Sequence, residues 1–289
     1  MSTVEKDAVS GTDTTGHEWD GIKELNTPLP KWWLYVFYAC IVWAIGYWVL
    51  YPAWPTLSGY TRGVLGYSSR GEIARTMQAV ADSQKAWLDK IAATDIKQIA
   101  ADPELLRFAM GGGRAIFAAN CAPCHGAGGQ GAKGFPNLAD DSWIWGGSPE
   151  AILQTVSYGV RNGDERARPG MVMPSFGTEK TLDATQINDV AEYVLSLTDR
   201  ATDKAAAEKG KPIFAEQCAS CHGENGQGNQ EAGVPRLNGQ SWLFGGTKAD
   251  IVAQINHPRF GVMPVWAGRL TEAQIKMVAT YVHSLGGGQ

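Results

Sequence analysis

GRAIFAANCAPCHG (residues 113–126) recurs 97 positions later as GKPIFAEQCASCHG (residues 210–223), and these two stretches decide the fold. Three further blocks recur behind each copy in the same order: FPNLADDSWIWGG as VPRLNGQSWLFGG, MPSF as MPVW, and TLDATQINDVAEYVLSL as RLTEAQIKMVATYVHSL. Self-similarity in a fixed order indicates two homologous domains. We place them at residues 107–199 and 204–289, and we expect a mostly α fold.

Each copy contains one Cys-x-x-Cys-His motif, which is the spacing of c-type haem attachment. The two thiols add across the two vinyl groups of a haem, and the adjacent histidine then ligates the iron from one side. The motifs therefore predict two covalently bound haem c groups. The candidate residues are the thioether cysteines Cys121, Cys124, Cys218 and Cys221, and the axial histidines His125 and His222.

Two other uses of Cys-x-x-Cys pairs fit this sequence less well. One zinc ion could be held by four thiolates, but that site would leave the histidine after each pair unexplained. A thioredoxin-like redox motif needs a βαβ context, and no strand-rich pattern surrounds either pair.

The iron needs a sixth ligand or an open position. Met173 and Met263 occupy matching places in the two repeats, each before a proline and just ahead of the last helix. We expect each to ligate the haem of its own domain, because His/Met ligation suits electron transfer. Met171 is the competitor in the first domain, and His257 is an alternative in the second.

Residues 32–61 contain no charged residue, and the apolar stretch 32–51 would extend ~30 Å as a helix, the thickness of a bilayer core. A cleaved signal peptide is not indicated, since the stretch is too long and follows 31 mostly polar residues. We predict a transmembrane helix at 32–51. The nearby basic residues are balanced on its two sides, so they do not orient it.

The segments around the anchor complete the domain organisation. Residues 1–31 are polar, and we expect a flexible tail over about the first 25. Residues 52–106 are expected to form a connector, with a helical pattern of two or three helices from residue 68 onward.

Composition excludes some function classes. The chain has 289 residues, is 44% hydrophobic and carries a formal net charge of −4. No basic block could neutralise phosphates, so we expect no nucleic-acid binding. Of the five cysteines, only Cys40 lies outside the two motifs, within the apolar stretch, where we interpret it as a packing residue.

Taken together, GRAIF, CAPCH, FPNL, MPSF and AEYVLSL, with their second copies, resemble class I cytochrome c domains. In that family a glycine and an aromatic residue of the first helix cross the last helix. The resemblance implies that Gly113 and Phe117 meet Tyr193, and that Gly210 and Phe214 meet Tyr281. It also implies that the proximal histidines donate a hydrogen bond to a proline carbonyl, here of Pro136 and Pro235.

The N-terminal sequence KELNTPLPKWWLYVFYACIVWAIGYWVLYPAWP, with the tandem domains behind it, resembles the dihaem subunit III of cbb3-type cytochrome c oxidases over essentially the whole chain. That resemblance implies a subunit of the bacterial cytoplasmic membrane with its N-terminus inside and its haem domains in the periplasm. It also implies a relay of electrons from a soluble c-type cytochrome to a monohaem cytochrome c subunit and a haem–copper subunit, where O2 is reduced and protons are pumped.

Three other functions remain open at this point. They are the cytochrome subunit of another membrane oxidoreductase such as an alcohol dehydrogenase, a dihaem peroxidase, and a haem-based gas sensor. A peroxidase or a gas sensor needs an iron with an open position or a different sixth ligand. No motif for an independent substrate-turnover centre stands out in the sequence.

Overall fold

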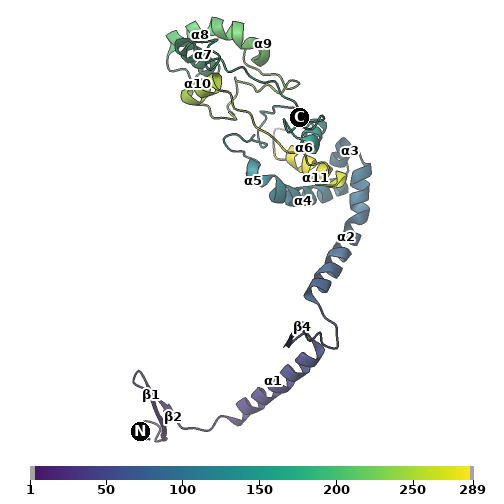
Figure 1. Cartoon of the computed structure of the whole chain (residues 1–289), viewed down its shortest axis with the longest axis vertical. Coiled ribbons are helices and arrows are strands. Elements are labelled where there is room, and N and C mark those ends of the chain that lie inside the picture. Colours follow the sequence, from purple (N-terminus) through teal and green to yellow (C-terminus); the bar gives the residue numbers. More distant parts are fainter. Residues whose placement is uncertain (1–3, 287–289) are drawn as a thin grey trace. The chain divides into compact units, whose positions relative to one another are not determined.

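The computed structural model describes residues 4–286 and is mostly helical, as predicted (Figure 1). Two compact units divide the chain, residues 1–82 and 83–289. The first unit carries the apolar helix, and the second carries both Cys-x-x-Cys-His motifs.

A β-hairpin occupies part of the expected tail. Strand β1 (Thr14–Trp19) pairs antiparallel with β2 (Ile22–Leu25). The turn between them is Asp20-Gly21, with φ values of 49° and 84°. Asp-Gly is a favoured two-residue hairpin turn because both central residues need a positive φ. The prediction of a flexible tail is therefore wrong over these strands.

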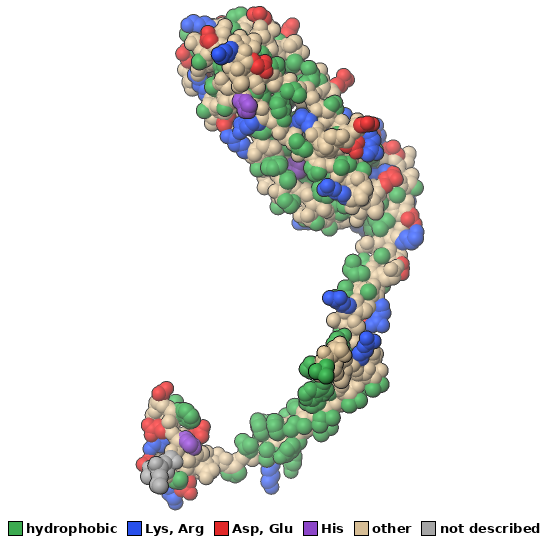
Figure 2. Space-filling view, viewed as in Figure 1, with side chains coloured by type: hydrophobic (Ala, Val, Ile, Leu, Met, Phe, Trp, Pro, Cys, Tyr) green, Lys and Arg blue, Asp and Glu red, His purple; other side chains and the backbone are tan. Residues whose placement is uncertain are grey.

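Helix α1 (Lys31–Leu50) matches the predicted transmembrane segment to within one residue at each end. Within residues 4–286 it is the one helix long and apolar enough to cross a membrane, and none of it is buried by the chain. Figure 2 shows its surface covered by hydrophobic side chains. Aromatic rings cluster at its C-terminal end, where Tyr47 stacks on Tyr51 at 4.5 Å and Trp48 meets Trp54 edge-on at 4.8 Å. Aromatic belts of this kind mark membrane–water interfaces.

The predicted connector contains β3 (Pro55–Thr56), β4 (Gly59–Tyr60), α2 (Ser69–Ala93), α3 (Ile96–Ala101) and the start of α4 (Pro103–Asn120). The end of α2 packs into a small apolar core with α3, α4 and the last helix, α11 (Glu272–His283). Lys276 of α11 donates to the carbonyl oxygens of Ala92 and Thr94 at 2.6 and 3.0 Å. The end of the connector is thus built into the second unit.

The second unit consists of two helical lobes (Figure 1). Lobe 1 contains α3, α4, α5 (Ala122–His125), α6 (Pro149–Tyr158) and α11. Lobe 2 contains α7 (Ala184–Ser196), α8 (Lys204–Gln217), α9 (Ala219–His222) and α10 (Lys248–Asn256). Lobe 2 is therefore one continuous piece of chain inserted between α6 and α11 of lobe 1.

The two sequence repeats have exchanged their last helices. Phe117 contacts Tyr281 at 5.4 Å between ring centroids, and Tyr193 contacts Phe214 at 5.0 Å. The predicted pairing of Phe117 with Tyr193 and of Phe214 with Tyr281 is wrong. The physical reason is that the two repeats present equivalent glycine, phenylalanine and tyrosine positions, so either last helix fits either first helix.

The crossing glycines make the exchanged packing close. A Cβ on Gly113 would lie 2.3 Å from the carbonyl oxygen of Met277 in α11, and one on Gly210 would lie 2.0 Å from that of Asp189 in α7. Only a residue without a side chain allows helices to approach so closely. Residues 107–199 and 204–289 remain the sequence repeats, but the packed lobes do not coincide with them.

The segments that lead out of α6 and into α11 pair with each other where they pass between the lobes. Val160 and Met263 exchange both backbone hydrogen bonds, each at 3.0 Å. The side chains of the next two residues add to this pair. Arg161 Nε donates to the carbonyl oxygen of Gly261, and Asn162 Nδ2 to that of Met263, both at 2.9 Å.

Glu192 of α7 holds lobe 2 together from its interior. The fully buried carboxylate accepts hydrogen bonds from the backbone N–H groups of Thr202 and Asp203 at 2.8 and 3.1 Å. It also forms an ion pair with Lys248 at the start of α10, at 2.9 Å. Burial by itself raises the pKa of Glu192, but Lys248 and these N–H groups outweigh it and lower the pKa to about 2. The side chain therefore links α7, α8 and α10.

Replacing this carboxylate should destabilise lobe 2 in a pH-dependent way. Glu192→Gln removes the charge from these hydrogen bonds, so we expect the free energy of unfolding at pH 7 to fall by about 2 kcal/mol. Because the folded-state pKa lies below the unfolded value, the stabilisation is present above about pH 4.5 and is lost as the pH falls towards 2. Denaturant unfolding of the haem-loaded chain between pH 3 and 7 measures both effects.

The matched control is Glu208→Gln, because Glu208 is an exposed carboxylate on the neighbouring helix α8. It should leave the stability nearly unchanged. Equal losses in the two variants, or a loss in Glu192→Gln that does not shrink at low pH, would contradict the role given to Glu192.

Candidate haem sites

Each lobe encloses one large cavity with a Cys-x-x-Cys-His motif in its wall. Cavity 1, in lobe 1, is lined by Cys121, Cys124 and His125, and cavity 2, in lobe 2, by Cys218, Cys221 and His222. Their empty volumes are about 1170 and 1370 Å³, part of which is open to solvent.

A helix end followed by a short helix positions each motif. The backbone N–H of Cys121 donates to Phe117 at the end of α4, and the chain then turns through α5 to bring His125 beside the cysteines. Cys218, α9 and His222 repeat this arrangement after α8. The motif residues therefore lie together, as expected.

A proline carbonyl orients each histidine. Nδ1 of His125 lies 3.0 Å from the carbonyl oxygen of Pro136, and Nδ1 of His222 lies 3.0 Å from that of Pro235. With Nδ1 as the donor, Nε2 is the ring nitrogen left to bind a metal. Burial lowers the pKa of both histidines and so favours the neutral imidazole, although the proline carbonyls oppose this shift.

The first cysteine of each motif, Cys121 or Cys218, packs against the core of its lobe. Burial, together with the neighbouring Cys124 or Cys221, raises the pKa of the Cys121 and Cys218 thiols to about 11. Before haem attachment, both thiols are therefore protonated at neutral pH and weakly nucleophilic.

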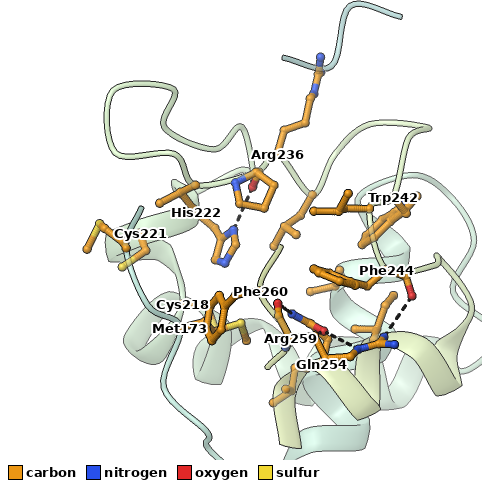
Figure 3. A pocket seen from close by; sticks show the side chains of 18 of the residues that line it. Met173, Cys218, Cys221, His222, Arg236, Trp242, Phe244, Gln254, Arg259 and Phe260 are labelled. Atoms are coloured by element: carbon orange, nitrogen blue, oxygen red, sulfur yellow. Dashed lines mark hydrogen bonds between the residues drawn. The ribbon is translucent and has the colours of Figure 1, made fainter. Parts of the chain in front are cut away.

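The methionines are exchanged between the repeats. Met263, from the second repeat, lines cavity 1 with His125, and Met173, from the first, lines cavity 2 with His222 (Figure 3). The prediction that each methionine faces the motif of its own repeat is wrong. The cause is the exchange of last helices, because each methionine lies in the segment that leads to an exchanged helix.

The two alternative ligands differ in their positions. Met171 also lines cavity 2, but its side chain is 52% exposed, whereas Met173 is packed against the core of lobe 2. His257 is exposed and lines neither cavity.

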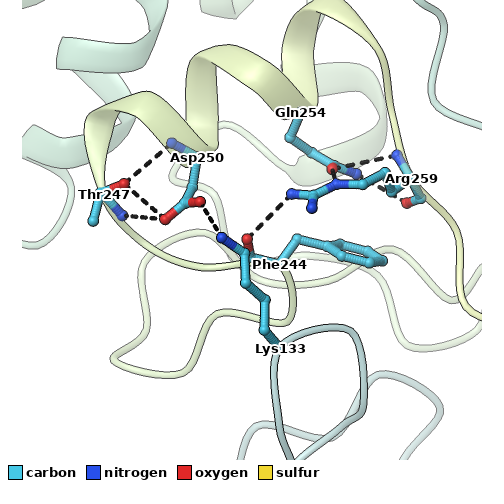
Figure 4. Close-up of polar contacts among 6 residues, drawn as sticks. All are labelled: Lys133, Phe244, Thr247, Asp250, Gln254 and Arg259. Carbon is cyan, nitrogen blue, oxygen red and sulfur yellow. Dashed lines mark hydrogen bonds and ion pairs between the residues drawn. The ribbon is translucent and has the colours of Figure 1, made fainter.

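The rim of cavity 2 carries polar groups from α10 and from the loops before and after it. Arg259 donates to the carbonyl oxygen of Phe244 at 3.3 Å and is held by Gln254 (Figure 4). Lys133 of lobe 1 forms an ion pair with Asp250 of lobe 2, which joins the two lobes there. Hydrogen bonds from Lys133 and then Thr247 lower the pKa of Asp250 to about 2.

Comparison with known proteins gives the family. Residues 11–58 match the N-terminal domain of cytochrome oxidase-cbb3, FixP, residues 112–198 match cytochrome c, and residues 205–282 match subunit III of cbb3-type cytochrome c oxidase. The cbb3-type cytochrome c oxidase subunit CcoP of Azospirillum brasilense is 55% identical over 298 residues, covering 100% of both chains. The chain belongs to the CcoP/FixP family.

Two further members of the family are also similar over nearly their whole length. Subunit FixP of Azorhizobium caulinodans is 52% identical, covering 98% of this chain and 96% of that one. Subunit CcoP of Cereibacter sphaeroides is 48% identical, covering 96% and 95%. The resemblance to the dihaem subunit III of cbb3-type oxidases is therefore confirmed.

Membership of the CcoP/FixP family implies covalently bound haem c, and the cavities fit this cofactor. Each combines two thiols, an oriented histidine and at least one methionine in a mainly apolar wall. In cavity 2 the buried Nε1 of Trp242 has no hydrogen-bond partner among the described residues, and a haem carboxylate is an acceptor it could use. The two cysteine pairs line separate cavities, and the described residues hold no cluster of three or more His, Cys, Asp or Glu for a metal ion.

Sequence reasoning missed the residues between the cavities. Ile144, Arg161 and Leu243 line both cavity 1 and cavity 2. Ile144 and Leu243 occupy the same place in the repeated blocks SWIWGG and SWLFGG, and this repetition could have singled them out. Nothing in the repeat pattern marked Arg161.

Gly159 is required where the chain crosses towards Met263. Its φ is +73°, and a Cβ would lie 2.2 Å from the carbonyl oxygen of Met263. We expect Gly159→Ala to lower the stability of the haem-loaded chain by about 2–4 kcal/mol, through backbone strain and the clash together. Thermal unfolding followed by circular dichroism measures the loss.

Gly163→Ala is the matched control, since Gly163 has a similar φ of +88° but nothing within 4 Å of its added Cβ. Gly163→Ala should lower the stability by only about 1 kcal/mol, the part that comes from backbone strain. Equal losses of stability in Gly159→Ala and Gly163→Ala would contradict the requirement for a glycine at position 159.

Proposed function

We propose that this chain accepts electrons from a soluble c-type cytochrome and relays them to the catalytic part of a cbb3-type oxidase. Its partners there are a monohaem cytochrome c subunit and a haem–copper subunit, where O2 is reduced to water and protons are pumped. The bound haems supply reversible one-electron transfer. The chain itself holds them, orients their ligands and sets the distance between the two sites.

The observation that carries this proposal is the wall shared by the two cavities. Ile144, Arg161 and Leu243 line both, so single side chains separate one site from the other. A carrier that passes electrons between two sites needs them this close. Mainly apolar cavities also limit the access of water, which suits electron transfer better than turnover of a polar substrate.

We assign the axial ligands across the repeats. His125 and Met263 would hold the iron of haem 1, which is attached at Cys121 and Cys124. His222 and Met173 would hold the iron of haem 2, attached at Cys218 and Cys221. A histidine and a methionine together raise the reduction potential and close the iron to external ligands, which favours a carrier over a peroxidase or a gas sensor.

The proposed location is the bacterial cytoplasmic membrane, with α1 as a single-pass anchor. The residues before α1 would lie in the cytoplasm and the haem lobes in the periplasm. Covalent haem attachment on the outer side of that membrane, as in cytochromes c, supports this orientation. The apolar, unburied surface of α1 supports the anchor.

The ligand assignment predicts which methionine serves which haem. In a chain with Cys218→Ala and Cys221→Ala, which keeps only haem 1, Met263→Ala should abolish the Met–Fe(III) charge-transfer band of the oxidised protein. Met173→Ala in the same chain should leave that band in place and serves as the control. In a chain with Cys121→Ala and Cys124→Ala, which keeps only haem 2, Met173→Ala should abolish the band and Met263→Ala should leave it in place.

Oxidised-state optical spectra on samples with one covalent haem per chain measure this. Loss of the haem 1 band in Met173→Ala, with retention in Met263→Ala, would show ligation within each repeat and overturn the assignment.

Purification of the intact complex tests the function as a whole. A complex isolated through a tag on this chain should contain haem b and copper in addition to haem c, and should oxidise a reduced c-type cytochrome with uptake of O2. A quinoprotein partner without copper would instead place the chain in a different membrane oxidoreductase.

A further inference from the structure

The wall between the two cavities contains one charged residue. Of the three side chains that line both cavities, Ile144 and Leu243 are apolar, and Arg161 carries a permanent positive charge. Arg259, by contrast, lines only cavity 2. Arg161 is thus placed to act on both sites at once.

Several contacts fix Arg161 in this position. Its Nε donates to the carbonyl oxygen of Gly261 at 2.9 Å, and its guanidinium lies 5.9 Å from the centre of the Phe260 ring. A Cβ on Gly170 would lie 2.2 Å from Nη1 of Arg161, so the chain packs closely against the guanidinium. Its backbone has a φ of +50°, which is uncommon for a residue with a side chain.

Within residues 4–286, the charge of Arg161 has no carboxylate counter-ion. The side chain is half-buried, so its charge is screened less than that of an exposed arginine. A fixed, unpaired cation between two apolar cavities is costly unless it interacts with what those cavities hold.

We propose that Arg161 raises the reduction potentials of both haems together and so keeps them matched. Reduction adds one electron to a ferric haem and breaks no bond, so the site loses one unit of positive charge. A nearby cation therefore favours the reduced form of each haem. Because Arg161 faces both cavities, it shifts the reduction equilibria of both haems in the same direction. The difference between the two reduction potentials therefore changes little.

This inference rests on the proposed electron relay, in which matched potentials let an electron move either way between the sites. Arg161 is a positioning residue in this scheme, because it acts on the potentials of the carriers and provides no ligand. Arg161 could also act only as a structural residue, through its hydrogen bond to Gly261. The test therefore separates the effect of its charge from the effect of that hydrogen bond.

The experiment is a spectroscopic redox titration of the full-length, haem-loaded chain in detergent, with Arg161→Gln, Arg161→Lys and Arg259→Gln. Arg161→Gln should lower both midpoint potentials, by about tenfold in each reduction equilibrium constant, which is about 59 mV for one electron. Arg161→Lys keeps the charge without the Nε hydrogen bond and should stay close to the wild type. Arg259→Gln should lower the potential of haem 2 alone.

The two haems are told apart in Met173→His and Met263→His chains, each of which should move one potential away from the other. Both midpoints falling in Arg161→Gln supports the proposal. A fall in only one midpoint, or in neither, overturns it, and so does an equal fall in Arg161→Lys, which would show a structural effect.

Failure of the ligand assignment in the proposed function gives a different result. If neither Met173→His nor Met263→His moved a potential, the assigned methionine ligands would be wrong, whatever Arg161 does. The response to Arg161→Gln in the otherwise unchanged chain would still decide the role of Arg161. A covalent haem count of two and an unchanged circular dichroism spectrum confirm that each variant is folded and loaded.

Discussion

The backbone pair between Val160 and Met263 is the contact on which the haem-binding unit depends. It joins the two segments that pass between the lobes, and it holds Met263 directly at cavity 1. It also places Arg161, the next residue, against Gly261. Contacts elsewhere keep the lobes in register, including the hydrogen bond of 2.6 Å from the N–H of Gly134 to the carbonyl oxygen of Leu243. The thickness of the wall between the cavities follows from these contacts.

Features that are determined by short stretches of sequence could be predicted. The apolar run of α1, the two Cys-x-x-Cys-His turns and the helices of the connector all depend on neighbouring residues, and the structure has them where expected. The hairpin of residues 14–25 could also have been found, because Asp20-Gly21 is a favoured turn, but the polar composition around it suggested a tail instead.

The partners of the last helices could not be predicted. Tyr193 and Tyr281 occupy equivalent positions, as do Phe117 and Phe214, so each contact is equally good within a repeat or between repeats. The choice is made by the crossing segments, whose pairing involves residues about 100 positions apart, such as Arg161 with Gly261. Everything that depends on that choice, including which methionine faces which histidine, needed the three-dimensional structure.

The insertion of lobe 2 into lobe 1 also sets an order of assembly. A chain emerges from the ribosome N-terminus first, so every helix of lobe 2 is available once residue 256 has appeared. Lobe 1 must wait for α11, although its own cysteines were made much earlier. Until then Phe117 has no cover from Tyr281 or Val278. The first haem site to be synthesised is therefore the last to close, and a chain cut short before Glu272 would retain all the helices of only one of its two lobes.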